Sequence, residues 1–177
     1  MKNVLIRGPL LNSAGYGVHA RQIFSYINQR KDCKITSQVT PWGVCTFYLN
    51  GDYEKGLISE IIDTSHPSDT PSDISFQIQL PNEWDPTVAK FNIGVTAGVE
   101  TDKCSQEWID CINKMDLVIV PSQHTKRTFE KSGDVRTKIE VVPEYIIPEI
   151  LESNLDPMKL DVKTKFNSSL RLPFRIR

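Results

Sequence analysis

Short apolar runs, separated by longer stretches, constrain the fold of this 177-residue chain more than any other feature. The clearest run is LVIV at 117–120, and VLI at 4–6 is of the same kind. Short runs rich in β-branched residues are typical of strands that are covered on both faces. The strands predicted from such runs and from alternating segments cover residues 4–6, 34–40, 74–80, 91–96, 117–120 and 139–142.

Helix-like segments lie between most of these strands. Apolar residues at helical spacing predict helices over 15–30, 53–63 and 105–115, and a fourth between Ser122 as N-cap and Gly133 as stop. The stretch between 64 and 73, rich in Ser, Pro, Thr and Asp, predicts a loop. Because strands and helices alternate, we expect an α/β domain of the Rossmann-like three-layer type, with a mostly parallel sheet and helices on both faces.

Two helix faces follow from the same pattern. In the helix at 15–30, the apolar positions approximate a stripe that is expected to pack on the sheet: Val18, Ile23, Tyr26 and Ile27. On the helix after Ser122, polar and charged residues predict a solvated face: His124, Lys126, Arg127 and Lys131.

The composition excludes several classes of partner and site. A net charge of −1 argues against binding to nucleic acid or to a membrane surface. No signal peptide is predicted, because the first apolar run is too short and Arg7 interrupts it. No stretch reaches the ~20 apolar residues of a membrane span, so we expect a cytoplasmic protein. The four cysteines and three histidines have no zinc-ligand spacing, which predicts free buried thiols and no metal.

The segment GPLLNSAGYGVHARQ at 8–22 is the first candidate site. Its G-x-G-x-x-A pattern lacks the context of a dinucleotide fingerprint: seven residues separate Arg7 from Gly15, and no acid follows the second predicted strand. The P-loop pattern is also absent. A glycine-rich loop that leads into a helix can hold an anion on backbone N–H groups, or it can serve only as a helix entrance. Both interpretations stay open at this point.

Three stretches together resemble the N-terminal domain of GT-B glycosyltransferases, in particular the retaining family 4 group. SAGYGVHARQIFSYI resembles the first loop and helix of that domain. FNIGVTAGVETDKCSQEWIDCINKMDLVIVPSQHTKRTFEKSG resembles its second half, and IEVVPEYI resembles its last strand and loop. The resemblance covers residues 1–150, although the family usually has a glycine where Tyr145 stands.

The resemblance implies two Rossmann-like domains facing a cleft, with the acceptor on the first and the nucleotide-sugar donor on the second. It implies catalysis without a metal and no cofactor beyond the nucleotide-sugar co-substrate. We expect a domain at 1–150 and a linker with a basic tail at 151–177, which ends before a donor-binding domain. This chain is then the acceptor-binding half of a hexosyltransferase, inactive by itself, with a carbohydrate or glycan acceptor. An exposed lobe surface further predicts a homodimer.

The resemblance also implies the site residues. Gly15, Tyr16 and Gly17 line the cleft and contact the acceptor or a donor phosphate. Glu100 and Thr101 follow the strand at 91–96, and Glu100 is the candidate catalytic residue that bonds sugar hydroxyls or accepts the acceptor proton. His19, one turn into the first helix, is a further candidate for substrate binding.

Two alternatives remain beside the transferase. One is a non-catalytic Rossmann-like module that binds a sugar or a phosphate. The other is a flavodoxin-like or regulatory α/β domain; its phosphoacceptor form is set aside, because Arg7-Gly8 rather than an acidic cluster ends the first strand. Trp42 and Trp84 lie in predicted loops, where an aromatic ring either stacks on a sugar or packs over the sheet.

Overall fold

The computed structural model describes residues 1–67 and 70–146. Residues 1–145 form one compact unit, and 146–177 are grouped apart from it. The predicted linker and basic tail at 151–177 therefore lie outside the described residues. Within that described part no helix has the length and apolar character needed to span a membrane.

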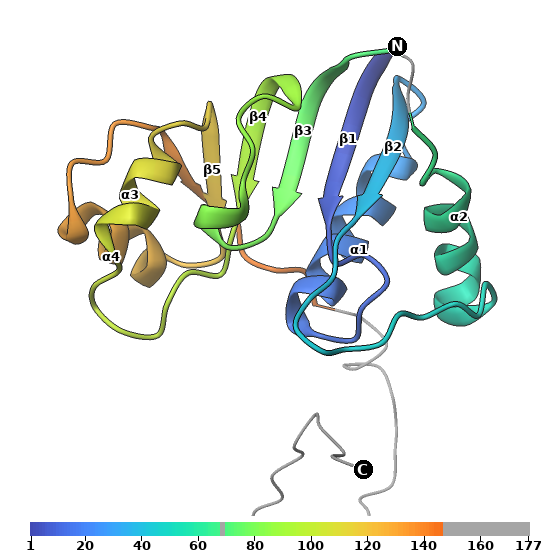
Figure 1. Cartoon of the computed structure of the whole chain (residues 1–177), viewed down its shortest axis with the longest axis horizontal. Helices are drawn as coiled ribbons and strands as arrows, with labels where there is room; N and C mark the ends of the chain where they lie inside the picture. The colour runs from blue at the N-terminus through green and yellow to red at the C-terminus, as the bar shows by residue number, and fades with distance from the viewer. Residues whose placement is uncertain (68–69, 147–177) are drawn as a thin grey trace, which may run out of the picture. The chain divides into compact units, whose positions relative to one another are not determined.

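Strands and helices alternate along the described chain (Figure 1). The strands are β1 (Lys2–Gly8), β2 (Cys33–Val39), β3 (Ser72–Ile78), β4 (Ala89–Val95), β5 (Leu117–Val120) and β6 (Ile139–Val141). The helices are α1 (Gly15–Asn28), η1 (Tyr53–Gly56), α2 (Leu57–Asp63), η2 (Pro81–Glu83), α3 (Gln106–Ile112) and α4 (Gln123–Ser132). Every predicted strand is found within a few residues of its expected position. The predicted helix at 53–63 divides into η1 and α2, because Glu54 and Lys55 have positive φ.

The six strands form one parallel sheet in the order β2-β1-β3-β4-β5-β6. The chain runs from β1 outward to β2 and then crosses back to β3 on the other side of β1. The sheet is therefore doubly wound, with its switch point between β1 and β3, and its order extends the flavodoxin-like order by one strand. In such sheets ligands bind outside the carboxyl ends of the strands.

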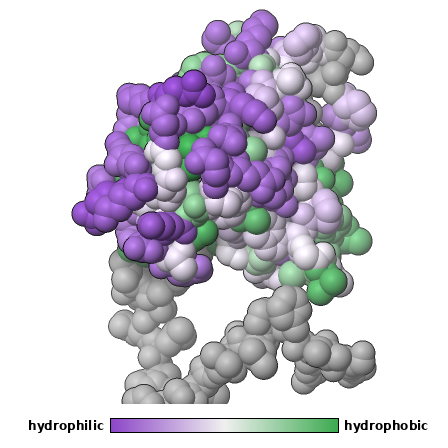
Figure 2. Space-filling view, turned by 60° about the vertical axis from the view of Figure 1, so that its left-hand side comes forward, coloured by the Kyte–Doolittle hydropathy of each residue, from purple (hydrophilic) through white to green (hydrophobic). Residues whose placement is uncertain are grey.

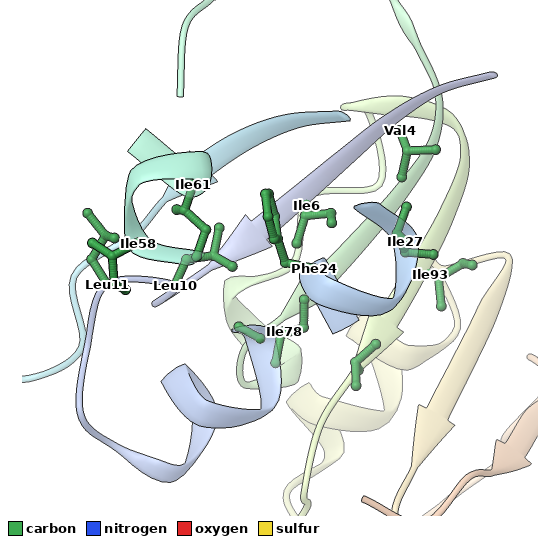
Figure 3. Close-up of a cluster of buried hydrophobic side chains, with 12 residues drawn as sticks. Val4, Ile6, Leu10, Leu11, Phe24, Ile27, Ile58, Ile61, Ile78 and Ile93 are labelled. Carbon is green, nitrogen blue, oxygen red and sulfur yellow. The ribbon is translucent and has the colours of Figure 1, made fainter. Parts of the chain in front are cut away.

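Helices cover both faces of the sheet, as predicted. The strand register places Val4 and Ile6 on one face with Ile93, and α1 and α2 pack there in one apolar cluster (Figure 3). Val118 and Val120 point to the opposite face, where α3 and α4 pack in a second cluster. Figure 2 brings the α3 and α4 side forward and shows mostly hydrophilic residues on its outside.

The predicted apolar stripe of α1 is wrong in part. Val18 is 37% exposed and Tyr26 is 67% exposed. The buried positions are Gly17, Ala20, Arg21, Phe24 and Ile27. These positions follow i, i+3, i+4, i+7 spacing. A hydropathy pattern does not reveal this face, because Gly17 and the charged Arg21 do not count as apolar.

Other local predictions are confirmed or corrected by the structure. Ser122 caps α4, since its hydroxyl accepts a hydrogen bond from the N–H of Thr125, and Gly133 is the C-cap. On α4, His124, Arg127 and Lys131 are exposed, but Lys126 is half-buried and donates to the carbonyl of Ile139.

All four cysteines are free, as predicted, yet none is fully buried. Trp84 packs over the sheet, where a Cβ added to Gly94 would lie 2.7 Å from its ring.

Candidate functional site

The loop between β1 and α1 is fixed by hydrogen bonds from Arg21, a buried residue of α1. Arg21 is 3% exposed, and its Nη1 donates to the carbonyls of Leu10 at 3.1 Å and Asn12 at 2.7 Å. Its Nε donates to Oε1 of Glu54 at 2.8 Å. The side chain of Asn12 in turn accepts from the N–H of Ala14 at 2.7 Å. Buried carbonyls of the loop are thus satisfied by one guanidinium, and the loop enters the helix in a single conformation.

The first turn of α1 has no cap. Ala14 is the N-cap residue, its side chain cannot accept a hydrogen bond, and the first turn contains no acid. Within residues 1–67 and 70–146, the N–H groups of Gly15, Tyr16 and Gly17 have no acceptor. These N–H groups and the positive end of the helix dipole favour an anion at this position.

Tyr16 joins this helix start to the far side of the switch point. Its hydroxyl lies 2.8 Å from Oγ1 of Thr96, just past β4, and accepts from the N–H of Ala97 at 3.1 Å. The pKa of Tyr16 is raised, mainly because burial disfavours the phenolate, so the hydroxyl keeps its proton and can donate to Thr96. Thr125 of α4 donates to the carbonyl of Ala97 at 2.9 Å. The start of α1, the residues just after β4 and the start of α4 are therefore connected by hydrogen bonds.

Trp42 stacks on Tyr16 from the loop after β2. The ring centroids lie 4.4 Å apart, with an interplanar angle of 23°. Trp42 is half-buried, so one aromatic surface stands beside the uncapped helix start. Aromatic rings of this kind contribute large apolar contact area, and hydroxylated rings stack on them readily.

His19 faces the segment that follows β6. Its Nδ1 lies 3.4 Å from Oε1 of Glu144, and its side chain is 13% exposed. Nearby, Gln22 donates to the carbonyl of Tyr145 at 3.2 Å. The pKa of His19 is lowered, mainly because burial disfavours the charged imidazolium, although the charge of Glu144 acts in the opposite direction. His19 therefore contacts the last described segment of the chain and is a positioning residue in this structure.

A pH dependence of stability follows from His19. The unfolded imidazole takes up a proton near pH 6.5, whereas the folded one does so only at lower pH. The unfolded state therefore binds more protons below pH 6.5, and the free energy of unfolding decreases as the pH falls through that range. We expect His19→Gln to weaken this decrease, measured by urea denaturation at several pH values. His124→Gln, at an exposed position, should retain it; an equal decrease in wild type and His19→Gln would contradict the assignment.

Glu100 and Thr101 lie in the same loop, which connects β4 to α3, a few residues after Thr96 and Ala97. Both are exposed, and Glu100 has no hydrogen bond or ion pair with another described residue. Thr101 donates to the carbonyl of Lys103 at 2.8 Å, and its own carbonyl accepts from Thr128 at 3.4 Å. The structure thus connects Thr96 and Ala97, rather than Glu100 and Thr101, to Tyr16.

Gly17 differs from Gly15 in its role. A Cβ at Gly17 would lie 2.2 Å from the carbonyl oxygen of Asn12 and 2.8 Å from that of Pro9, whereas a Cβ at Gly15 would meet nothing within 4 Å. Gly17 is needed for close packing between helix and loop, whereas the Cβ position at Gly15 is open space.

Sequence reasoning missed several residues of this site. Arg21, Thr96 and Thr125 had no signal in the pattern, because each acts through contacts with residues distant in the chain. Within the described ranges no group of three or more His, Cys, Asp or Glu side chains is placed to hold a metal ion. A hollow of about 250 Å³ is lined by Asp102 of the loop after β4 and by residues of α4.

Comparison with family models, with curated proteins and with solved structures found no match to this chain.

Proposed function

We propose that this chain is the acceptor-binding half of a glycosyltransferase that transfers a sugar from a nucleotide-sugar donor. One observation carries the proposal: the uncapped start of α1 stands beside the stacked rings of Tyr16 and Trp42, at the carboxyl ends of a parallel sheet. The free N–H groups suit a phosphate oxygen, and the aromatic surface suits a sugar ring. The resemblance in sequence order supports the same assignment.

Each site residue has a part in this proposal. Gly15, Tyr16 and Gly17 supply the N–H groups, and the hydroxyl of Tyr16 holds the loop after β4 beside them. His19 sets the position of the segment after β6. Glu100 stands as the proposed base for the acceptor hydroxyl, with Thr101 beside it. A carbohydrate acceptor, a homodimer, and a cytoplasmic location remain parts of the proposal.

A non-catalytic module that binds a sugar or a phosphate is the second candidate. The specific observation in its favour is that the helix start, the aromatic pair and the loop after β4 all belong to residues 1–145. All the contacts described at this site therefore lie within residues 1–145, whereas sugar transfer requires a donor site in addition.

Gly15→Pro tests the helix start directly. Gly15 is the first helical residue and Ala14 is extended, so proline fits there and removes one N–H without breaking the helix. We expect UDP-glucose, GDP-mannose or ADP-glucose to bind the wild type. Gly15→Pro should weaken this binding by about tenfold to a hundredfold, since a hydrogen bond to a charged group contributes about 1.5–3 kcal/mol. Isothermal titration calorimetry measures the change.

Gly15→Ala is the matched control, because it retains the N–H and its Cβ meets nothing within 4 Å. It should bind as the wild type does. Equal affinity of Gly15→Pro and Gly15→Ala would exclude the helix start as the phosphate site. Binding of glucose alone, lost in Trp42→Ala, would favour an acceptor or module without phosphate recognition. Binding of a disaccharide acceptor, weakened in Glu100→Gln, would favour the acceptor-binding half of a transferase over the module.

A further inference from the structure

Polar side chains gather on the sheet face opposite α1, across β2, β1 and β3. Arg7 of β1 is the register partner of Gln38 and of Gln77, so these three side chains form one row. Thr40 and Gln79 stand two residues further along their strands, and the ladder continues to both through hydrogen bonds from their N–H groups. Because side chains alternate between faces, Thr40 and Gln79 form the next row on the same face.

This face contains nearly all of the unsatisfied polar atoms in the described part of the chain. In the described part of the chain, five side-chain nitrogen or oxygen atoms are buried without a hydrogen-bond partner. Four of them belong to this face: Arg7 Nε, Thr40 Oγ1, Gln79 Oε1 and Trp84 Nε1. Gln79 is 5% exposed and Trp84 is 8% exposed. Trp84 packs on Gly94, which is the register partner of Gln77 and so lies on this face. Buried polar groups in native proteins are nearly always paired, so this concentration needs an explanation.

Gln77, in the same row as Arg7, and Asn92, nearer the amino ends of the strands, are both paired. Gln77 accepts from the N–H of Asp85 at 2.8 Å and donates to the carbonyl of Asp85 at 2.7 Å. Asn92 accepts from Ser75 at 2.8 Å and donates to two backbone carbonyls. The unpaired atoms come from β1, from the residues just after β2 and β3, and from Trp84, which packs on Gly94 of β4. The carboxyl edge between β1 and β3 is the switch point of the sheet, where ligands of doubly wound folds bind.

The chemistry of the four atoms defines a ligand class. Arg7 and Trp84 offer N–H donors, Gln79 offers a carbonyl acceptor, and the hydroxyl of Thr40 can act as either. The guanidinium of Arg7 is half-buried and donates to Gln77 at 3.3 Å. Its charge acts on the nearby carboxylate of Asp85, although the two form no ion pair within 4.0 Å in the described part of the chain. A guanidinium in this state favours an anionic oxygen, whereas the carbonyl of Gln79 requires a hydroxyl or N–H donor.

A hollow of about 750 Å³ lies beside this row and is lined in part by Leu5, Thr36 and Gln38. Gln38 is the register partner of Arg7, although Arg7, Thr40, Gln79 and Trp84 do not themselves line the hollow. No residue of the loop at 8–17 lines it, which separates this hollow from the start of α1.

We propose that Arg7, Thr40, Gln79 and Trp84 bind a small hydroxylated anion, with its charged oxygen on Arg7 and Trp84 and a hydroxyl on Gln79. A sugar phosphate and a sugar acid share this chemistry. The residues that bind it differ from those proposed at the start of α1, and the proposal does not depend on glycosyl transfer.

Side-chain N–H correlation spectra of the whole chain test the proposal, because Arg7 Nε–H and the indole N–H of Trp84 are direct reporters. The probes are glucose 6-phosphate, gluconate, glucose and inorganic phosphate. We expect saturable shifts of both reporters with glucose 6-phosphate or gluconate, and which of the two binds more tightly decides between phosphate and carboxylate. Glucose and inorganic phosphate should each bind at least about tenfold more weakly. Glucose lacks the charged oxygen for Arg7 and Trp84, and inorganic phosphate lacks the sugar hydroxyls for Gln79.

Variants connect the shifts to the residues. Arg7→Met should abolish binding, while Arg136→Met, at an exposed position, should retain it. If Arg7→Met does not fold, Gln79→Leu serves instead and should weaken binding of the hydroxylated anions toward that of inorganic phosphate. Gly15→Pro should leave the Arg7 and Trp84 shifts unchanged, so failure here is distinguishable from failure at α1. Absence of shifts at millimolar probe, or equal binding of glucose 6-phosphate and inorganic phosphate, would overturn the proposal.

Discussion

Gly17→Ala is expected to lower the free energy of unfolding by about 3 kcal/mol, the upper range for overpacking in a dense interior. The added Cβ would lie 2.2 Å from the carbonyl oxygen of Asn12 and 2.8 Å from that of Pro9. Both neighbours are backbone atoms, so no side-chain rotation relieves the clash, and the loop or the helix must shift. Because Arg21 holds the same loop through the carbonyl of Asn12, the shift also disturbs a buried hydrogen bond.

Urea denaturation measures this change, with Gly15→Ala as the matched control. Gly15 lies two residues away at the open end of the same helix, and its Cβ would meet nothing within 4 Å. It should unfold within about 0.5 kcal/mol of the wild type, as substitutions at unconstrained positions usually do. If Gly17→Ala were as stable as Gly15→Ala, the tight contact between α1 and the loop would be contradicted.

Arg21→Met is expected to destabilise the chain by a similar amount, about 3 kcal/mol, the low end for breaking a buried pair. Methionine fills much of the space but leaves the carbonyls of Leu10 and Asn12 without their donor, and Glu54 without its partner. It also removes the guanidinium that lies 5.5 Å from the ring centre of Tyr48. Unpaired buried carbonyls are costly because no water replaces the lost donor.

Arg30→Met is the control for Arg21→Met. Arg30 is exposed and forms its pair with Asp32 in water, where ion pairs contribute little. We expect nearly unchanged unfolding for Arg30→Met. A similar loss in both variants would show that charge alone, rather than the buried contacts of Arg21, sets the stability of the loop.

Much of the α/β fold could be predicted because its information is local. Strand β5 was predicted at its observed bounds, since four consecutive apolar residues end at a proline. The start of α4 followed from Ser122, whose hydroxyl accepts from the N–H of Thr125, three residues further along the chain. The face of α1 was harder, because the buried face contains Gly17 and Arg21. Hydropathy treats a buried, fully bonded arginine as an exposed one.

The candidate site was predictable only in part for the same reason. The glycine pattern located Gly15 and Gly17 at a strand end, but it did not distinguish their roles. The bond between Tyr16 and Thr96 joins residues 80 positions apart, and that between Thr125 and Ala97 joins residues 28 apart. No local pattern encodes such pairs, because they depend on which strands become neighbours.

The sequence by itself determined the alternation of strands and helices, the parallel sheet and the glycine-rich entrance to α1, because hydrophobic spacing and capping chemistry act over a few residues. Only the tertiary structure decided the strand order, the switch point between β1 and β3, the uncapped helix beside Trp42, and the unpaired atoms around Arg7 and Gln79. These features depend on the connections between parallel strands. The packing of the whole core determines beside which strand each connection places the next one.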